Sequence, residues 1–272
     1  MINKKVAFIG GGHITEIIIQ AVSAKTVLAA DSMIVSDPDK CRRDHLQKTF
    51  GVVTTPSNPL AVSTADYVFV NVLPQVVDTV IDELCRASFP RNKTIISLAA
   101  GIPLDRYKCL GEEVPIIRAL PNPPSQIGMG ITAIAYNPKV TKKQIKEVSG
   151  LFSALGDYVF LSESQINTVT ALSTPALVYL FFQALVDAGV RGGIDSKTST
   201  QIVSKTIFGA MEVWKRRKVS PQELLSEAST PGGISVECLF TLEKYAIRAA
   251  LSEAISNGAS KADAFSITRT RK

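Results

Sequence analysis

Three consecutive glycines follow a short apolar run near the start of the chain and precede a segment of helical length. The apolar run is residues 5–9, the glycines are residues 10–12, and the helix is expected to begin at His13. Gly10 and Gly12 form a G-x-G pair, which permits a tight turn and lets backbone amides approach a pyrophosphate at a helix N-terminus. The spacing predicts a dinucleotide-binding loop, with Thr15 where the usual fingerprint has a third glycine or alanine.

An acidic residue ends the second predicted strand, where dinucleotide-binding folds place the group that meets the adenosine ribose. Asp37 has this position, 25 residues after Gly12. Lys40, Arg42 and Arg43 follow, and they could instead hold a 2′-phosphate. The acid favours NADH and the basic residues favour NADPH, so the sequence leans only slightly to NADH.

A second glycine pair opens the last long predicted helix, in the segment Pro231-Gly232-Gly233. At a helix start the backbone amides have no intrahelical acceptor, so those of Gly233, Ile234 and Ser235 would form a carboxylate site. The Ser235 hydroxyl lies in the first turn, within reach of such a ligand. The alternative at this position is a simple capped turn.

Short apolar runs alternate with helical segments over the first 160 residues, and this alternation predicts a parallel doubly wound sheet. The expected strands are residues 5–9, 33–36, 67–72, 94–98, 116–119, 131–136 and 158–161, and the expected helices are 13–24, 39–50, 76–84 and 142–155. Only helices are expected after residue 162, at about 165–188, 196–214, 221–227 and 234–256. We therefore expect a Rossmann-type α/β domain at residues 1–162 and an all-α domain at residues 163–272.

Composition excludes several classes of protein. Of the 272 residues, 46% are hydrophobic and 20% charged, which is typical of a globular chain and not of a disordered one. The four cysteines form no C-x-x-C pair and lie far in sequence from the two histidines, so neither a zinc finger nor a disulfide framework is expected. The spacing of the cysteines indicates that their thiols are reduced, and we expect no metal site.

Charge and hydropathy predict a cytoplasmic protein that binds neither nucleic acid nor membrane. The net charge is +6, but the basic residues are scattered apart from short runs at 142–143, 215–218 and 269–272, and there is one Trp. The first nine residues lack the apolar core of a secretory signal. The most apolar segment, residues 176–186, is shorter than the roughly 20 residues that a membrane span needs.

The sequence resembles the pyrroline-5-carboxylate reductase family from about Lys5 to Ala254. The segments that carry the resemblance are residues 8–12, 72–76, 97–101, 118–122, 169–173, 184–190 and 231–233. The resemblance implies an NAD(P)H-dependent reductase of a cyclic imino acid, most simply of 1-pyrroline-5-carboxylate to L-proline in proline biosynthesis. It also implies an N-terminal Rossmann domain and a C-terminal helical domain that forms homodimers, which often assemble into larger rings.

The resemblance also assigns site residues. It places the imino acid between the nicotinamide and the Pro-Gly-Gly helix end, and gives the Ser235 hydroxyl, where threonine is usual, the catalytic role of a hydrogen bond to the ring nitrogen. The expected substrate-binding residues are Ser173, Thr174, Gly232, Gly233, Ile234 and Ser235. With the loop and the ribose acid, the expected cofactor-binding residues are Gly10, Gly12, His13, Ile14, Asp37, Leu73, Pro74, Ala99, Gly101 and Asn122.

This chain departs from the family pattern at several of these motifs. His13-Ile14 replaces Asn-Met, Leu73 replaces a lysine, and Pro123 replaces a threonine. The segment 172–177 is two residues shorter than usual and lacks a tyrosine. His13 either contacts the phosphates or only substitutes for asparagine in the turn. Two alternatives therefore stand beside proline synthesis: a paralogue that reduces another cyclic imine, and a non-catalytic cofactor-binding regulator.

Overall fold

The computed structural model describes residues 4–267, and the basic tail at 269–272 lies outside them. The chain divides into two compact units, one of Met1–Ser173 with Ser256–Lys272 and one of Thr174–Ile255. The boundary expected at residue 162 coincides with the start of helix α6 (Glu163–Leu172), whereas the division by contacts lies after α6. The first unit also includes the later part of helix α11 (Ile247–Ile267), from Ser256 onward.

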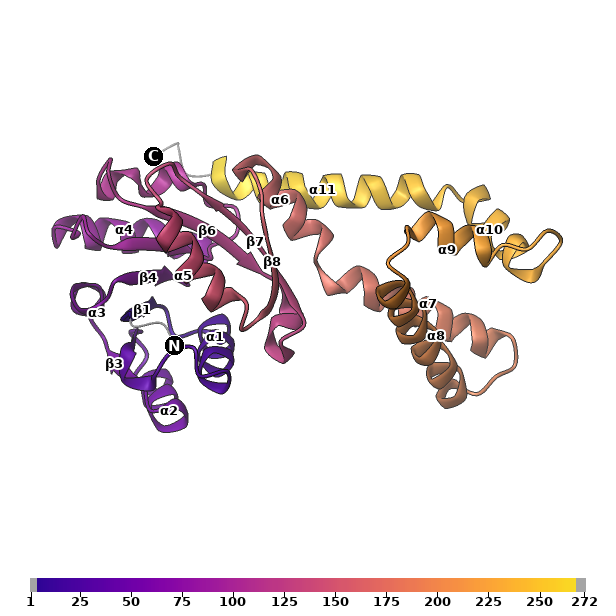
Figure 1. The fold of residues 1–272 in the computed structure, drawn as a ribbon, viewed down its shortest axis with the longest axis horizontal. Helices are drawn as coiled ribbons and strands as arrows, with labels where there is room; N and C mark the ends of the chain where they lie inside the picture. The colour runs from indigo at the N-terminus through magenta and orange to yellow at the C-terminus, as the bar shows by residue number, and fades with distance from the viewer. Residues whose placement is uncertain (1–3, 268–272) are drawn as a thin grey trace. The chain divides into compact units, whose positions relative to one another are not determined.

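An eight-stranded sheet in the order β3-β2-β1-β4-β5-β6-β7-β8 forms the centre of the first unit (Figure 1). Its strands are β1 (Val6–Ile9), β2 (Met33–Ser36), β3 (Val53–Thr55), β4 (Tyr67–Val70), β5 (Thr94–Ser97), β6 (Ile116–Pro121), β7 (Gly130–Tyr136) and β8 (Gly156–Phe160). All neighbouring strands pair in parallel except β6 with β7. The predicted doubly wound α/β fold is confirmed, with the addition of this antiparallel pair.

Helices cover both faces of the sheet, as its strand sequences require. Successive residues of β1 point to opposite faces: Val6 and Phe8 belong to one hydrophobic core, and Ala7 and Ile9 to the other. The first core also takes side chains from α1 (His13–Ala24), α2 (Lys40–Phe50) and α5 (Lys142–Phe152). The second takes them from α3 (Asn58–Thr64), α4 (Val77–Arg86) and the 3₁₀ segment η3 (Leu104–Leu110). Burial on both sides explains the continuous apolar runs of β1 and β4.

A buried arginine joins the sheet to two helices of the same unit. Arg118 on β6 is 2% exposed, and its guanidinium donates to Asn167 Oδ1 on α6 at 2.5 Å. The side-chain amide of Asn167 donates in turn to Asp263 on α11, and Glu163 lies 3.6 Å from the guanidinium. Burial lowers the pKa of Arg118, and the charge of Glu163 opposes that shift. Arg118 Nε has no hydrogen-bond partner within the described residues.

The second unit consists of helices: α7 (Pro175–Arg191), α8 (Ser196–Arg217), α9 (Pro221–Glu227), α10 (Ile234–Lys244) and the first part of α11. Two helices predicted as continuous are each broken. Residues 165–188 divide between α6 and α7, because Pro175 begins a new helix whose Ala176 amide donates to the Thr174 hydroxyl. Residues 234–256 divide between α10 and α11 at Ala246, which has a left-handed φ of 52°.

Candidate functional site

The glycine loop that follows β1 has the geometry of a dinucleotide-binding turn. Gly10 has φ +96°, and a Cβ there would lie 2.8 Å from the carbonyl oxygen of Asn71, so this position requires glycine. A Cβ on Gly12 would meet nothing within 4 Å. The first glycine therefore fits against the protein, and the third faces open space.

Unpaired backbone amides gather at the N-terminus of α1. Within the described residues, the N–H groups of Gly12, His13 and Ile14 have no acceptor, and His13 is exposed. Amides in this position and the helix dipole together attract an anion. The loop thus fits the pyrophosphate of a dinucleotide, as the sequence predicts.

Asp37 braces the glycine loop from the end of β2. Its Oδ2 accepts the amide N–H of Gly11 at 2.7 Å, and its Oδ1 accepts that of Asp39 at 2.8 Å. Each carboxylate oxygen keeps lone-pair capacity for another donor, such as a ribose hydroxyl. Asp37 therefore has a structural function at the loop, and its contact with an adenosine ribose stays a prediction.

The basic residues after β2 are engaged with the same loop. The Arg42 guanidinium donates to the carbonyl oxygens of Gly11 and Gly12 and pairs with Glu16 Oε2 at 2.5 Å. His45 contacts the other Glu16 oxygen at 3.1 Å. Hydrogen bonds from His45 and then Arg42 lower the pKa of Glu16. The charge of Arg42 is thereby paired with Glu16, and its side chain is fixed to the loop.

A buried hydrogen-bond network of Thr15 and Asn71 lies below the loop, and the sequence pattern did not predict it. Thr15 is fully buried; its hydroxyl donates to the Gly10 carbonyl at 2.6 Å and accepts from the Asn71 side-chain amide at 3.0 Å. Asn71 Oδ1 is buried and has no partner in the described part of the chain. The signal was present at Thr15, where the usual fingerprint has a small apolar residue.

The other predicted cofactor residues follow the carboxyl ends of neighbouring strands. Ile9, Val70 and Ser97 lie in register on β1, β4 and β5, so the segments after them begin at one edge of the sheet. Leu73 and Pro74 follow β4, and Ala99 and Gly101 follow β5. Leu73 is 70% exposed, whereas Ala99 and Gly101 are buried. The structure brings these residues to the glycine-loop edge, and their contacts with a cofactor stay predictions.

The side chain of Asn122 is committed to neighbouring backbone. Its amide donates to the Ser173 carbonyl at 3.1 Å, and its Oδ1 accepts the Ile131 amide at 2.8 Å. Asn122 therefore fastens the end of α6 to the segment after β6. These hydrogen bonds give Asn122 a structural function, and its predicted contact with the cofactor stays a prediction.

The Pro-Gly-Gly turn lies in the second unit and agrees only in part with the predicted carboxylate site. The prediction that the Gly233 amide is free is wrong, because this N–H donates to the Thr230 carbonyl at 2.9 Å and closes the turn. The amides of Ile234 and Ser235 have no acceptor within the described residues, and both side chains are exposed. Gly232 has φ +70°, which suits glycine. Two amides and the Ser235 hydroxyl remain available to a ligand.

The remaining predicted substrate residues lie at the junction of α6 and α7. Ser173 ends the first unit, and its carbonyl accepts from Asn122. Thr174 begins the second unit and caps α7. Substrate contacts from either residue stay predictions.

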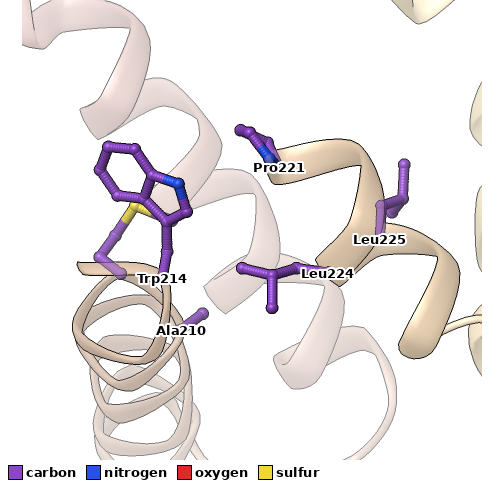
Figure 2. Close-up of a pocket in the computed structure, with 6 residues that line it drawn as sticks. Ala210, Trp214, Pro221, Leu224 and Leu225 are labelled. Carbon is purple, nitrogen blue, oxygen red and sulfur yellow. The ribbon is translucent and has the colours of Figure 1, made fainter. Parts of the chain in front are cut away.

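An apolar cavity of about 410 Å³ lies between α8 and α9 (Figure 2). Its lining residues are Ala210, Met211, Trp214, Pro221, Leu224 and Leu225. Their side chains include no acid, base or nucleophile, and no predicted site residue lines the cavity.

Sheet order, glycine turn and unpaired amides together define a Rossmann-type dinucleotide-binding domain. Residues 5–101 match the family model described as NADP oxidoreductase coenzyme F420-dependent. Residues 163–265 match the model described as pyrroline-5-carboxylate reductase dimerisation.

Full-length relatives define the family. A pyrroline-5-carboxylate reductase of Synechocystis is 34% identical over 253 residues, which cover 92% of this chain and 94% of the relative. One of Pseudomonas aeruginosa is 32% identical over 97% of both chains. The chain belongs to the pyrroline-5-carboxylate reductase family.

Solved structures agree over nearly the whole chain. A pyrroline-5-carboxylate reductase from Coxiella burnetii, 27% identical, superposes with a TM-score of 0.89 and covers 97% of this chain and 99% of its own. The Plasmodium falciparum enzyme with NADP bound, 26% identical, gives 0.85 with the same coverage.

Proposed function

We propose that this protein reduces 1-pyrroline-5-carboxylate to L-proline with NADH or NADPH. The observation that carries the proposal is the similarity to pyrroline-5-carboxylate reductases over both units. The unpaired amides at the start of α1 support the cofactor, and those at the start of α10 support a carboxylate substrate. A paralogue acting on another cyclic imine and a non-catalytic regulator are the outcomes that the assay below must separate.

The residues of the glycine-loop edge hold and orient the cofactor. The amides of Gly12, His13 and Ile14 bind the pyrophosphate, and Asp37 accepts a hydrogen bond from the adenosine ribose. A bound reduced nicotinamide supplies the hydride. Asn71 Oδ1, a buried acceptor without a partner in the described chain, is a further hydrogen-bond acceptor beside the loop.

The start of α10 binds the imino acid. The amides of Ile234 and Ser235 hold the carboxylate, and the Ser235 hydroxyl contacts the ring nitrogen. Protonation of the imine nitrogen makes the adjacent carbon a good hydride acceptor, and the product amine stays basic. The site therefore needs orientation and a hydrogen-bonding group at nitrogen rather than a strong acid.

The coenzyme preference that we propose is a modest one for NADH. The Asp37 carboxylate at the ribose position repels a 2′-phosphate and accepts from a free 2′-hydroxyl. Arg42 is already paired with Glu16, which makes it less available to bind a 2′-phosphate. Arg43 donates to the carbonyl oxygens of Asp37 and Pro38, which fixes its guanidinium against the strand end.

The assembly that we propose is a homodimer, or a larger ring of dimers, in the cytoplasm. Large apolar side chains are exposed along α7 and α8, including Leu180 and Phe208. By length and composition alone the stretch 163–191 could cross a membrane, but Ser173 and Thr174 interrupt its helix and the dimerisation family covers it. We therefore propose that a second subunit buries these apolar side chains, and that the protein binds neither membrane nor nucleic acid.

A coupled assay tests the function. Purified protein is mixed with racemic 1-pyrroline-5-carboxylate and either coenzyme, and the absorbance of reduced nicotinamide is followed while proline is quantified separately. Stoichiometric proline formation is the expected result. Cofactor binding without oxidation on this substrate would overturn the proposal, and a panel of other cyclic imines then separates a different reductase from a regulator.

A further inference from the structure

Two cysteines on different elements of the first unit meet at the surface. Cys85 is the second-last residue of α4, and Cys109 is the second-last residue of η3. The Cys85 thiol donates to the Cys109 carbonyl, with Sγ and O 3.6 Å apart, and the Cys109 thiol donates to the Arg106 carbonyl at the same distance. Both residues are exposed, so a small reagent in solution can reach them.

The surrounding structure holds this cysteine pair in place. Leu84 and Leu110, the sequence neighbours of the two cysteines, are buried in the same core. An ion pair between Arg106 Nε and Asp78 Oδ1, 2.7 Å long, joins the same two elements near their other ends. The two cysteines are therefore neighbours because packing fixes α4 against η3.

We propose that Cys85 and Cys109 form a reversible modification site, which takes up small disulfides such as oxidised glutathione and closes to an intramolecular disulfide. One cysteine thiolate attacks the small disulfide, forms a mixed disulfide and expels one glutathione thiolate. The second cysteine thiolate attacks the protein sulfur of that mixed disulfide, forms the Cys85–Cys109 bond and expels the other. Two cysteine protons pass to the two glutathiones, so two protein thiols are oxidised and one glutathione disulfide is reduced.

The required movement is small. A disulfide needs an S–S distance of about 2.05 Å, and because Cys85 Sγ already lies 3.6 Å from the Cys109 backbone, the movement is a rotation of the two side chains about their Cα–Cβ bonds. Burial raises the pKa of the Cys109 thiol, and the neighbouring Cys85 adds to this shift. The thiolate is the nucleophile, so the raised pKa slows attack by Cys109 at neutral pH.

The sequence supplies matched controls and a direct readout. Cys41 and Cys238 are also exposed, but no cysteine is hydrogen-bonded to either within the described residues. Trypsin cleaves after Arg86 and Lys108, which places Cys85 in peptide 49–86 and Cys109 in peptide 109–118, each with a single cysteine. Linkage of these two peptides therefore identifies the bond.

The test incubates the folded full-length protein with oxidised glutathione and analyses a non-reducing tryptic digest. The expected product links peptides 49–86 and 109–118, disappears on addition of dithiothreitol, and leaves Cys41 and Cys238 with glutathione or unmodified. In Cys85→Ser, Cys109 should carry glutathione as a mixed disulfide that cannot close. In Cys109→Ser, the same should hold for Cys85. Separate glutathione adducts on Cys85 and Cys109 in the wild type, without linkage, would overturn the proposal, as would linkage to Cys41 or Cys238.

Discussion

The Gly11 amide donates to Asp37 Oδ2 at 2.7 Å, so the acid that follows β2 supports the glycine loop directly. Asp37→Ala should weaken NADH binding by about 10- to 150-fold, because a hydrogen bond to a charged group contributes about 1.5–3 kcal/mol. NADPH binding should fall less, since the substitution also removes repulsion of the 2′-phosphate. Fluorescence titration with each coenzyme measures both effects.

Asp39→Ala is the matched control for Asp37. The Asp39 carboxylate caps α2 through the Cys41 amide, so its loss should cost about 1 kcal/mol of stability without discriminating between coenzymes. Equal weakening of NADH and NADPH by Asp37→Ala would leave Asp37 as a brace of the loop only.

Ser235 should affect turnover and not cofactor affinity. Ser235→Ala removes one hydrogen bond near the imine nitrogen, which predicts a fall in kcat of about 10- to 150-fold. Ser235→Thr should retain activity because it keeps the hydroxyl. Steady-state kinetics with saturating coenzyme measure the effect, and Ser226→Ala, an exposed serine of α9, serves as the control. Wild-type kinetics for Ser235→Ala would remove this residue from the reaction.

Arg118 should contribute strongly to stability. Arg118→Ala leaves Asn167 and Glu163 without their buried partner, which should lower the free energy of unfolding by about 3–5 kcal/mol. Arg216→Ala breaks an exposed pair with Glu212 on α8 and should cost only about 0.3–0.5 kcal/mol. Urea denaturation of both variants measures the difference, and similar midpoints would show that the buried network adds little.

The pH dependence of stability should include a contribution from Glu16. Its pKa is lowered in the folded protein, so the stabilisation is complete above the ordinary value of about 4.5 and is lost as the pH falls through the folded value. Glu16→Gln should therefore be less stable than the wild type at pH 7, and the two curves should converge in acid below about pH 4.5. Thermal melts across this range test it, and a gap that persists unchanged to pH 3 would contradict it.

Self-association should depend on the apolar faces of the helical unit. Leu180 on α7 is 64% exposed, and burial of a leucine side chain contributes about 1.5–3 kcal/mol. Leu180→Asp should raise the dimer dissociation constant at least about tenfold, whereas Leu60→Asp on α3, also exposed, should leave it unchanged. Light scattering at micromolar concentration reports both, and a monomeric wild type would refute the assembly.

Local patterns predicted much of the first unit. The bounds expected for α1 and β2 coincide with the observed ones, since an apolar run ends in glycine at Gly10 and the second strand is followed by Asp37. β3 was missed because three residues, Val53–Thr55, are too few to show a periodicity. The helix break at Ala246 was missed because alanine gives no local stop signal.

The side-chain contacts of the site could not be predicted in this way. Sequence position places Asn122 at a strand end but does not reveal that its amide binds Ser173, 51 residues later. The Gly233 amide was expected to be free because the closure of its turn by Thr230 depends on backbone angles. Long-range partners and turn closure are set by the fold as a whole.

The return of α11 to the first unit has a consequence for synthesis on the ribosome. The Asn167 amide donates to Asp263, and Ala262 is buried, so residues made after the whole second unit complete a unit whose sheet strands emerged much earlier. A nascent chain that has already presented its whole glycine loop still lacks this last helix. Transcripts cut short before codon 256 therefore encode every strand of the nucleotide-binding fold, yet leave the Arg118 and Asn167 network open at one side.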